Sequence, residues 1–187
     1  MREITYAYGA IPHYMLTFET RQPVSPVITV FSSMFMHGGF FHLAGNMLYL
    51  WIFGNNIEDR LGHLRFIVFY AFCGIFAAYA NAITNPNSII PMIGASGAIS
   101  GVLGAYLLLF PKATVHTLIF LGFFITTVKI PALIVIGFWA IIQLVSGLFS
   151  AGLHEGGGVA WFAHIGGFLM GLVTIKLWLP RRTKQWL

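Results

Sequence analysis

Charged side chains are scarce in this sequence. Only 8% of its 187 residues are Asp, Glu, Lys or Arg, whereas soluble domains average about a quarter. Apolar residues make up 58%, and the mean hydropathy is +0.83. Four stretches contain no charged residue at all, namely 22–57, 66–111, 130–154 and 156–175. Each is long enough to cross a bilayer, which takes about 20 residues of helix, so the composition indicates a membrane protein.

The sequence also lacks the groups on which several kinds of membrane chemistry depend. Asp59 is the only aspartate and stands beside Glu58, outside the charge-free stretches, which excludes a protease with two membrane-embedded aspartates. Ion-driven carriers usually hold ionisable groups inside their spans, and these spans offer almost none except histidine. The seven histidines form neither an HExxH motif nor a pair four residues apart, so we expect no zinc site and no other cofactor. The single cysteine, Cys73, excludes an intrachain disulfide.

The charge-free stretches divide into five predicted membrane helices, at 34–53, 66–83, 89–110, 131–150 and 159–179. The segment 113–128 contains several threonines and is apolar over too short a length for a crossing, which favours an interfacial or re-entrant piece. Residues 1–30 hold no long apolar run, so we expect a polar loop there, without a signal peptide or a span. The predicted fold class is therefore all-α, a polytopic membrane helix bundle with five transmembrane helices.

Basic residues predict how this bundle is oriented, because loops rich in Lys and Arg stay in the cytoplasm. With five spans, Arg2 and Arg21 fall on one side, and the other basic residues fall on the opposite side: Arg60, Arg65, Lys112, Lys129, Lys176, Arg181, Arg182 and Lys184. We expect an extracytoplasmic loop region at 1–30, a membrane domain at 31–180 and a basic cytoplasmic tail at 181–187, in the cell membrane. The net charge of +5 follows from this topology and gives no reason to expect nucleic-acid binding.

Three polar groups stand within or at the ends of the predicted helices: His42 with Asn46, Ser96, and His164. Taken singly, each has an ordinary structural explanation. Ser96 stands among glycines, and small residues let membrane helices approach one another closely. His42 and Asn46 lie one turn apart and could hydrogen-bond to another helix. Only their combination points to chemistry.

The depths of Ser96 and His164 in the membrane agree. Proline and glycine before Ser96, and Pro111 after it, leave about 15 regular residues, which rise about 22 Å against a hydrocarbon thickness of about 30 Å. Ser96 is then about 8 Å below the outer boundary, and His164, counted inward from Val159, is about 7 Å deep. The two side chains are therefore expected at the same height.

Glycines share a helix face with each of these two residues. They are Gly97, Gly101 and Gly104 after Ser96, and Gly167 and Gly171 after His164. Two glycine faces can pack closely, which would bring the imidazole to the hydroxyl. A serine hydroxyl needs a neighbour to take its proton, and neutral histidine is the usual base. The pair therefore predicts a catalytic dyad, because the spans offer no carboxylate; the sequence does not indicate what orients His164.

Acyl transfer also needs donors for the oxyanion that develops. The Asn46 amide and the His42 imidazole can supply N–H groups from one face of the same helix. Counting outward from Phe53 puts Asn46 too deep, unless the helix continues past Gly54 toward Glu58. The exposed N–H groups at the helix N-terminus beside Ser96 also favour negative charge.

Three stretches carry these residues in order: MHGGFFHLAGNMLYLWIFGNNIEDRLG (36–62), GASGAISGVLGAY (94–106) and AHIGGFLMG (163–171). Together they resemble the rhomboid family of intramembrane serine proteases. The resemblance implies that the serine of GxSG, Ser96, is the nucleophile and that the histidine of AHxxGxxxG, His164, is the base. It likewise implies that His42 and Asn46 line the oxyanion hole. Rhomboid proteases have a six-helix core, and residues 1–30 resemble the loop after the first helix, so we expect that helix to be missing here.

The resemblance implies a substrate in the lipid bilayer, the transmembrane segment of another protein, cut near its outer end. A recessed serine also needs water, so we expect a polar cavity above Ser96, open to the outside. The HEGGG stretch at 154–158 is either a mobile cap over this cavity or a flexible connector. Two alternatives are a rhomboid-like protein that binds transmembrane helices without cutting them, which would usually lack the dyad, and a small channel or carrier, which the lack of buried charge disfavours.

Overall fold

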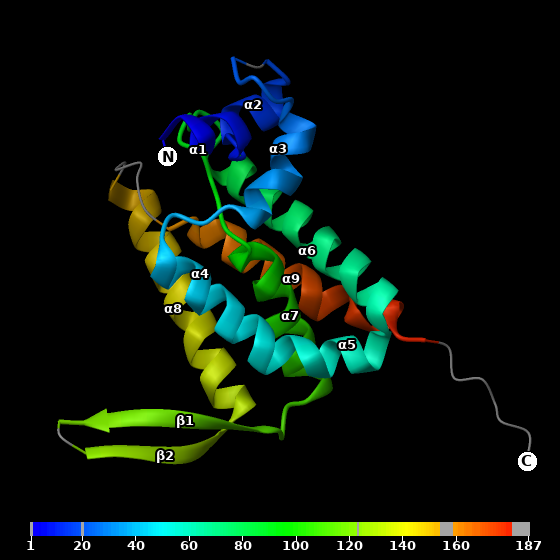
Figure 1. Cartoon of the computed structure of the whole chain (residues 1–187), viewed down its shortest axis with the longest axis vertical. Helices are drawn as coiled ribbons and strands as arrows, with labels where there is room; N and C mark the ends of the chain where they lie inside the picture. Colours follow the sequence, from blue (N-terminus) through cyan, green and yellow to red (C-terminus); the bar gives the residue numbers. More distant parts are fainter. Residues whose placement is uncertain (1, 20, 123, 154–158, 181–187) are drawn as a thin grey trace, which may run out of the picture.

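The structure is a computed structural model of the 187-residue chain, and it describes residues 2–19, 21–122, 124–153 and 159–180. Helices make up most of it, and a β-hairpin projects at one end (Figure 1). The predicted cap at 154–158 and the predicted tail at 181–187 lie outside the described residues.

Among the described residues, three helices are long and apolar enough to cross a membrane: α6 (His63–Thr84), α8 (Ala132–Leu153) and α9 (Trp161–Trp178). A fourth crossing results if Pro26–Phe35 and Phe40–Leu61, which meet at 84°, count as one bent span. The helix α7 (Ser96–Leu109) is apolar but has only 14 residues. The helical membrane bundle is therefore as predicted, whereas the count of five crossings is not confirmed.

The region predicted as a polar loop at 1–30 contains three short helices, and its extracytoplasmic position stays a prediction. The helices are α1 (Arg2–Tyr8), α2 (Pro12–Thr17) and α3 (Pro26–Ser32). Prolines begin α2 and α3, at the first helical position, where the missing N–H would have no partner anyway. Helices this short are not stable alone. Met15 of α2 and Val30 of α3 stabilise these two helices by packing on Ala78 and Ala82 of α6.

The first predicted span begins and ends later than expected. A 3₁₀ turn (Ser33–Phe35) and a non-helical stretch at 36–39 come first, and α4 (Phe40–Tyr49) then continues through a π-helical turn (Leu50–Gly54) into α5 (Asn55–Leu61). The segment between the first two predicted spans is therefore helical except at Gly62, since α6 begins at His63. The helix continues because Ile57 and Leu61, one turn apart, are buried in the core, and it ends at Gly62, where φ is +80°.

The segment predicted as an interfacial or re-entrant piece is a β-hairpin. β1 (Thr114–Leu121) pairs with β2 (Phe124–Pro131) in antiparallel register, with Thr114 opposite Pro131 and Leu121 opposite Phe124. The hairpin extends sideways from the end of the bundle where α8 begins (Figure 1), which replaces the re-entrant course. Threonine, valine and isoleucine dominate both strands, and β-branched residues suit a pleated strand better than a helix.

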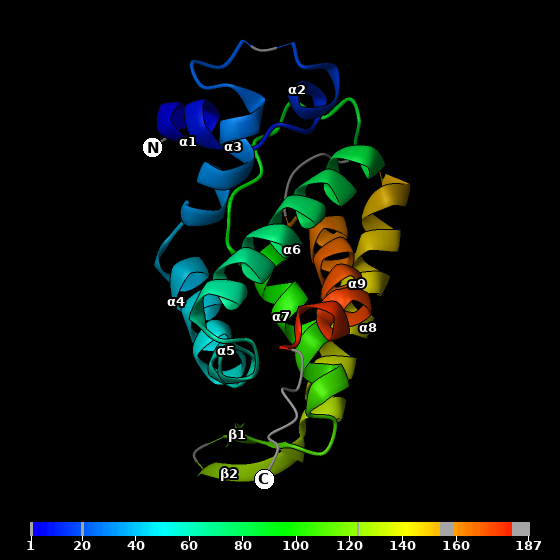
Figure 2. The ribbon, with the colours of Figure 1, turned by 90° about the vertical axis from the view of Figure 1, so that its right-hand side faces the viewer.

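The short helix α7 is enclosed by its neighbours. Every residue from Gly97 to Tyr106 is buried, and α7 packs against α6 and α9 (Figure 2). A Cβ atom on Gly167 would meet the carbonyl oxygen of Gly97, and one on Gly171 would meet that of Gly101. The two glycine faces therefore pack backbone to backbone, as predicted from their spacing.

We expect Gly167→Ala to destabilise the protein, because the added methyl group would meet a backbone carbonyl that cannot move unless α7 and α9 separate. The expected loss is about 1–3 kcal/mol in the free energy of unfolding, measured as a lower thermal midpoint in detergent. Gly137→Ala in α8 is the control, since nothing lies within 4 Å of its added Cβ, and we expect no loss of stability there. Equal midpoints for the two variants would contradict the proposed backbone contact.

Candidate active site

Ser96 is the first residue of α7 and is partly buried. The chain reaches Ser96 through a non-helical stretch in which Gly94 has φ +126°, a backbone conformation that residues other than glycine rarely adopt. The Gly94 N–H donates to the carbonyl of Ser33 at 2.9 Å, which fixes this stretch to the 3₁₀ turn. The first N–H groups of α7 have no partner inside the helix, and the helix dipole adds positive potential beside the Ser96 hydroxyl.

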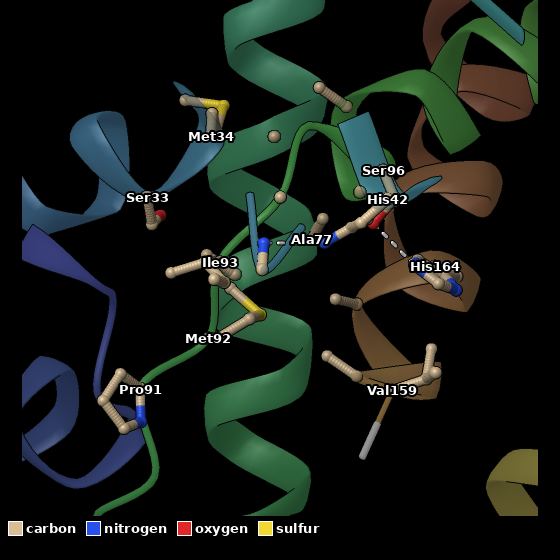
Figure 3. A pocket seen from close by; sticks show the side chains of 18 residues that line it. Ser33, Met34, His42, Ala77, Pro91, Met92, Ile93, Ser96, Val159 and His164 are labelled. Carbon is tan, nitrogen blue, oxygen red and sulfur yellow. Dashed lines mark hydrogen bonds between the residues drawn. The ribbon is translucent and has the colours of Figure 1, made fainter. Parts of the chain in front are cut away.

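His164 stands in the first turn of α9, and the structure brings its ring to Ser96. Its Nε2 lies 2.8 Å from the Ser96 Oγ, a hydrogen bond drawn in Figure 3. Its other ring nitrogen, Nδ1, lies 2.7 Å from Oε1 of Gln143 on α8. Three helices therefore contribute one polar group each to a continuous chain of hydrogen bonds.

His42 lies on α4, close to Ser96 (Figure 3). Its Nδ1 accepts a hydrogen bond from the Gly38 N–H at 3.2 Å, so the neutral ring carries its proton on Nε2. A Cβ atom placed on Gly94 would lie 2.8 Å from this Nε2 and 3.5 Å from the Ser96 Oγ. The only N–H of the His42 ring is thus presented at the space beside the serine hydroxyl.

Asn46 is buried, one turn after His42 on α4. Its Nδ2 donates to the His42 carbonyl at 3.0 Å, and an amide nitrogen carries a second hydrogen that can serve another acceptor. Counting outward from Phe53 puts Asn46 too deep unless the helix continues past Gly54, and the helix does continue, to Leu61.

Two cavities meet at these residues, and both are lined by His42, Ser96 and His164. The larger has a volume of about 440 Å³ and extends toward Ser33, Ile93 and Val159 (Figure 3). The smaller, of about 240 Å³, lies between α4 and α8 and includes Asn46. The cavity predicted at Ser96 is therefore present, but most of its lining residues are small or apolar, whereas we expected a polar one.

Sequence reasoning missed Gln143 and two tryptophans around His164. Trp139 of α8 and Trp161 of α9 place their rings 6.1 Å and 6.3 Å from the imidazole, measured between ring centroids. One signal for Gln143 was available, because it is the only amide side chain in the charge-free stretch 130–154. A buried polar group in an apolar helix usually has a partner or a function.

The arrangement can support acyl transfer to a serine. A hydroxyl within hydrogen-bonding distance of an imidazole is the geometry of a nucleophile and its base, and the N–H groups of His42 and Asn46 stand nearby as donors. In the part of the chain that the structure describes, no three His, Cys, Asp or Glu residues lie together as ligands for a metal ion.

Comparison with known families agrees with this interpretation of the fold. The family model described as the rhomboid domain matches residues 25–181, which is most of the chain. The chain belongs to the rhomboid family. The matched range includes all four predicted site residues, and it begins within the N-terminal helices and ends after α9.

Several rhomboid relatives align with parts of the chain. "Rhomboid protein 1, mitochondrial" of Saccharomyces cerevisiae is 32% identical over 155 residues, which are 80% of this chain and 41% of the yeast protein. "Presenilin-associated rhomboid-like protein, mitochondrial" of Homo sapiens is 34% identical over 118 residues, 60% of this chain and 31% of the human protein. "Putative rhomboid protease YdcA" of Bacillus subtilis is 39% identical over 72 residues, 38% of this chain and 36% of that protein. The alignments thus cover less than half of each of these relatives.

We expect Gly94→Ala to destabilise this rhomboid chain, because the new side chain would be strained at φ +126° and would meet the His42 ring at 2.8 Å. The strain alone costs about 1–3 kcal/mol, and the contact adds to it. Gly62→Ala is the matched control, since Gly62 also has a positive φ, of +80°, but faces open space. The test is thermal unfolding in detergent; a Gly94→Ala midpoint no lower than that of Gly62→Ala would contradict the close approach of the His42 ring to Gly94.

Proposed function

We propose that this rhomboid is an intramembrane serine endopeptidase with Ser96 as the nucleophile and His164 as the general base. The observation that carries the proposal is the 2.8 Å hydrogen bond between Ser96 Oγ and His164 Nε2. It joins residues 68 positions apart in the sequence, on two helices that glycines hold in contact. One relative also has the word protease in its name.

In the proposed reaction, His164 Nε2 takes the hydroxyl proton as Ser96 Oγ bonds to the carbonyl carbon of the scissile peptide. The tetrahedral intermediate carries its negative charge on the former carbonyl oxygen, and His42 Nε2–H, the Asn46 amide and the N-terminus of α7 stabilise it. His164 then gives the proton to the leaving amine as the C–N bond breaks. Water, activated by the same imidazole, hydrolyses the acyl-enzyme and returns Ser96 to its free form.

The proposed substrate is the transmembrane segment of another membrane protein, cut near its outer end. Ser96 is recessed in a cavity that is mostly apolar, which suits a peptide arriving from lipid more than a fully hydrated one. A peptide bond inside a helix is shielded by its own hydrogen bonds, so residues that weaken the substrate helix near the cut should favour cleavage.

We also propose that the chain lies in the cell membrane with α1–α3 on the outer side and its C-terminal end in the cytoplasm. Arg60 of α5 and Lys129 of β2 belong to elements at one end of the bundle, where α9, which carries Lys176 in its last turn, also ends; α1–α3 lie at the other end (Figures 1 and 2). Basic residues favour the cytoplasmic side. The names of the yeast and human relatives contain the word mitochondrial, which describes the location of those proteins and not of this chain.

Cleavage should depend on both members of the dyad. We expect purified protein in liposomes to cut a model single-span substrate with Gly and Pro near its outer end, and expect Ser96→Ala and His164→Ala each to abolish measurable cleavage, as loss of nucleophile or base does. Gel analysis of the products measures this, and Ser100→Ala, the neighbouring serine on the same helix, is the control that should still cut. Cleavage that survives both substitutions would eliminate the mechanism, and a wild-type protein that binds the substrate without cutting would favour the non-proteolytic alternative.

Asn46→Ala should lower turnover and leave substrate binding almost unchanged, because an oxyanion donor acts on the transition state. We expect kcat to fall by about tenfold to a thousandfold, with KM little altered. Asn87→Ala, in an exposed turn that lines neither cavity, is the control. Steady-state cleavage rates measure both constants, and an unchanged kcat would remove Asn46 from the site.

A further inference from the structure

The side chain of Gln143 is buried in a helix that otherwise exposes much of its surface. Gln143 is 6% exposed, whereas its neighbours Ile142 and Leu144 are 41% and 49% exposed. Its amide therefore points into the bundle, toward α9. There Oε1 lies 2.7 Å from His164 Nδ1, on the side of the ring opposite to Ser96.

An amide oxygen can only accept a hydrogen bond, so the ring nitrogen that faces it must donate one. A neutral imidazole carries a single N–H. With that hydrogen on Nδ1, the Nε2 of His164 keeps its lone pair and can accept the proton of the Ser96 hydroxyl. In the other tautomer Nε2 would carry the hydrogen and could not act as the base.

We propose that Gln143 is a positioning residue that holds His164 in the tautomer required of a base. The inference rests on the proposed function for its catalytic meaning, although the tautomer itself does not depend on it. Gln143 would supply the orienting contact that a carboxylate provides in a serine triad, from a helix where no carboxylate is present. A neutral amide can be buried at lower cost than a charge, provided that it is hydrogen-bonded.

The surroundings of the imidazole support this orientation. The Trp139 ring, one turn before Gln143 on α8, is tilted by 39° to the His164 ring, and the Trp161 ring meets it edge-on at 90°. These rings restrict rotation of the imidazole about its side-chain bonds. The hydrogen bond to Gln143 then decides which of the two nitrogens carries the hydrogen.

Nitrogen NMR of ¹⁵N-histidine-labelled protein tests the tautomer, with the His164 signal identified by its loss in His164→Ala. We expect the Nδ1–H form in the wild type and in Gln143→Glu, whose side chain also presents an acceptor oxygen. Gln143→Met, of similar length but without an acceptor, should shift the population toward the Nε2–H form. Leu144→Met on the exposed face is the control and should leave the signal as in the wild type.

Kinetics supply the second measurement. An imidazole without its orienting contact still populates the useful tautomer part of the time, so we expect Gln143→Met to lower kcat by about 10- to 100-fold with KM unchanged. Gln143→Glu should retain more activity than Gln143→Met, and thermal unfolding should be similar in all variants. A pure packing role would not separate the Glu variant from the Met variant in this way.

The proposal is overturned if the wild type shows the Nε2–H form of His164, or if Gln143→Met keeps the wild-type tautomer. It is equally overturned if Gln143→Met shifts the tautomer but cleaves with the wild-type kcat, because the contact then has no catalytic consequence. A wild-type protein that shows the Nδ1–H form but cuts no substrate contradicts the proposed protease function alone, and the tautomer measurement then decides the contact with Gln143.

Discussion

Direct contact between the backbones of α7 and α9 determines the geometry of the site. Gly97 lies against Gly167, and Gly101 against Gly171, so the two helices meet in one register at two successive turns. In lipid no hydrophobic force draws helices together, and close approach through small residues supplies the van der Waals contact instead. Because Ser96 and His164 precede these glycines on their own helices, the same register sets the distance between hydroxyl and imidazole. The packing of α7 on α9 therefore contributes to stability and also sets the distance between the proposed nucleophile and base.

The shortness of α7 would place Ser96 below the membrane surface in the proposed orientation. A helix of full length would carry its N-terminus to the membrane surface, whereas α7 has 14 residues and is preceded by irregular backbone. Irregular backbone needs hydrogen-bond partners wherever water is excluded. Ser33 accepts from Gly94, and Ala10 exchanges two backbone hydrogen bonds with Met92. The N-terminal helices thus support the segment that carries the serine into the cavity.

Hydropathy predicted the long helices because their signal is local: α6, α8 and α9 agree with the predicted spans to within a few residues. The elements that were wrong depend on contacts that hydropathy does not represent. α2 and α3 are short helices stabilised by packing on α6, and α5 continues the preceding helix because Ile57 and Leu61 reach the core. The hairpin was missed for another reason. Its threonines and other β-branched residues give a weak membrane signal in hydropathy, but the same residues favour β-strands.

The residues of the site divide in the same way, into those that the spacing of residues in the sequence predicts and those that only the packing of the helices shows. Ser96 and His164 could be brought together from glycine spacing, because a helix repeat converts sequence intervals into faces. Gln143 could not, because its place beside His164 depends on how α8 is docked and rotated, and no interval in the sequence encodes that. Its hydrogen bond makes the protonation pattern of the proposed base depend on a helix outside the glycine contact. A movement of α8 that withdraws Gln143 would leave the Ser96 hydroxyl and the His164 imidazole in contact, but the imidazole would no longer be held in its Nδ1–H tautomer. The packing of α7 on α9 therefore controls the distance between the two groups, and α8 controls which ring nitrogen of the proposed base carries the hydrogen.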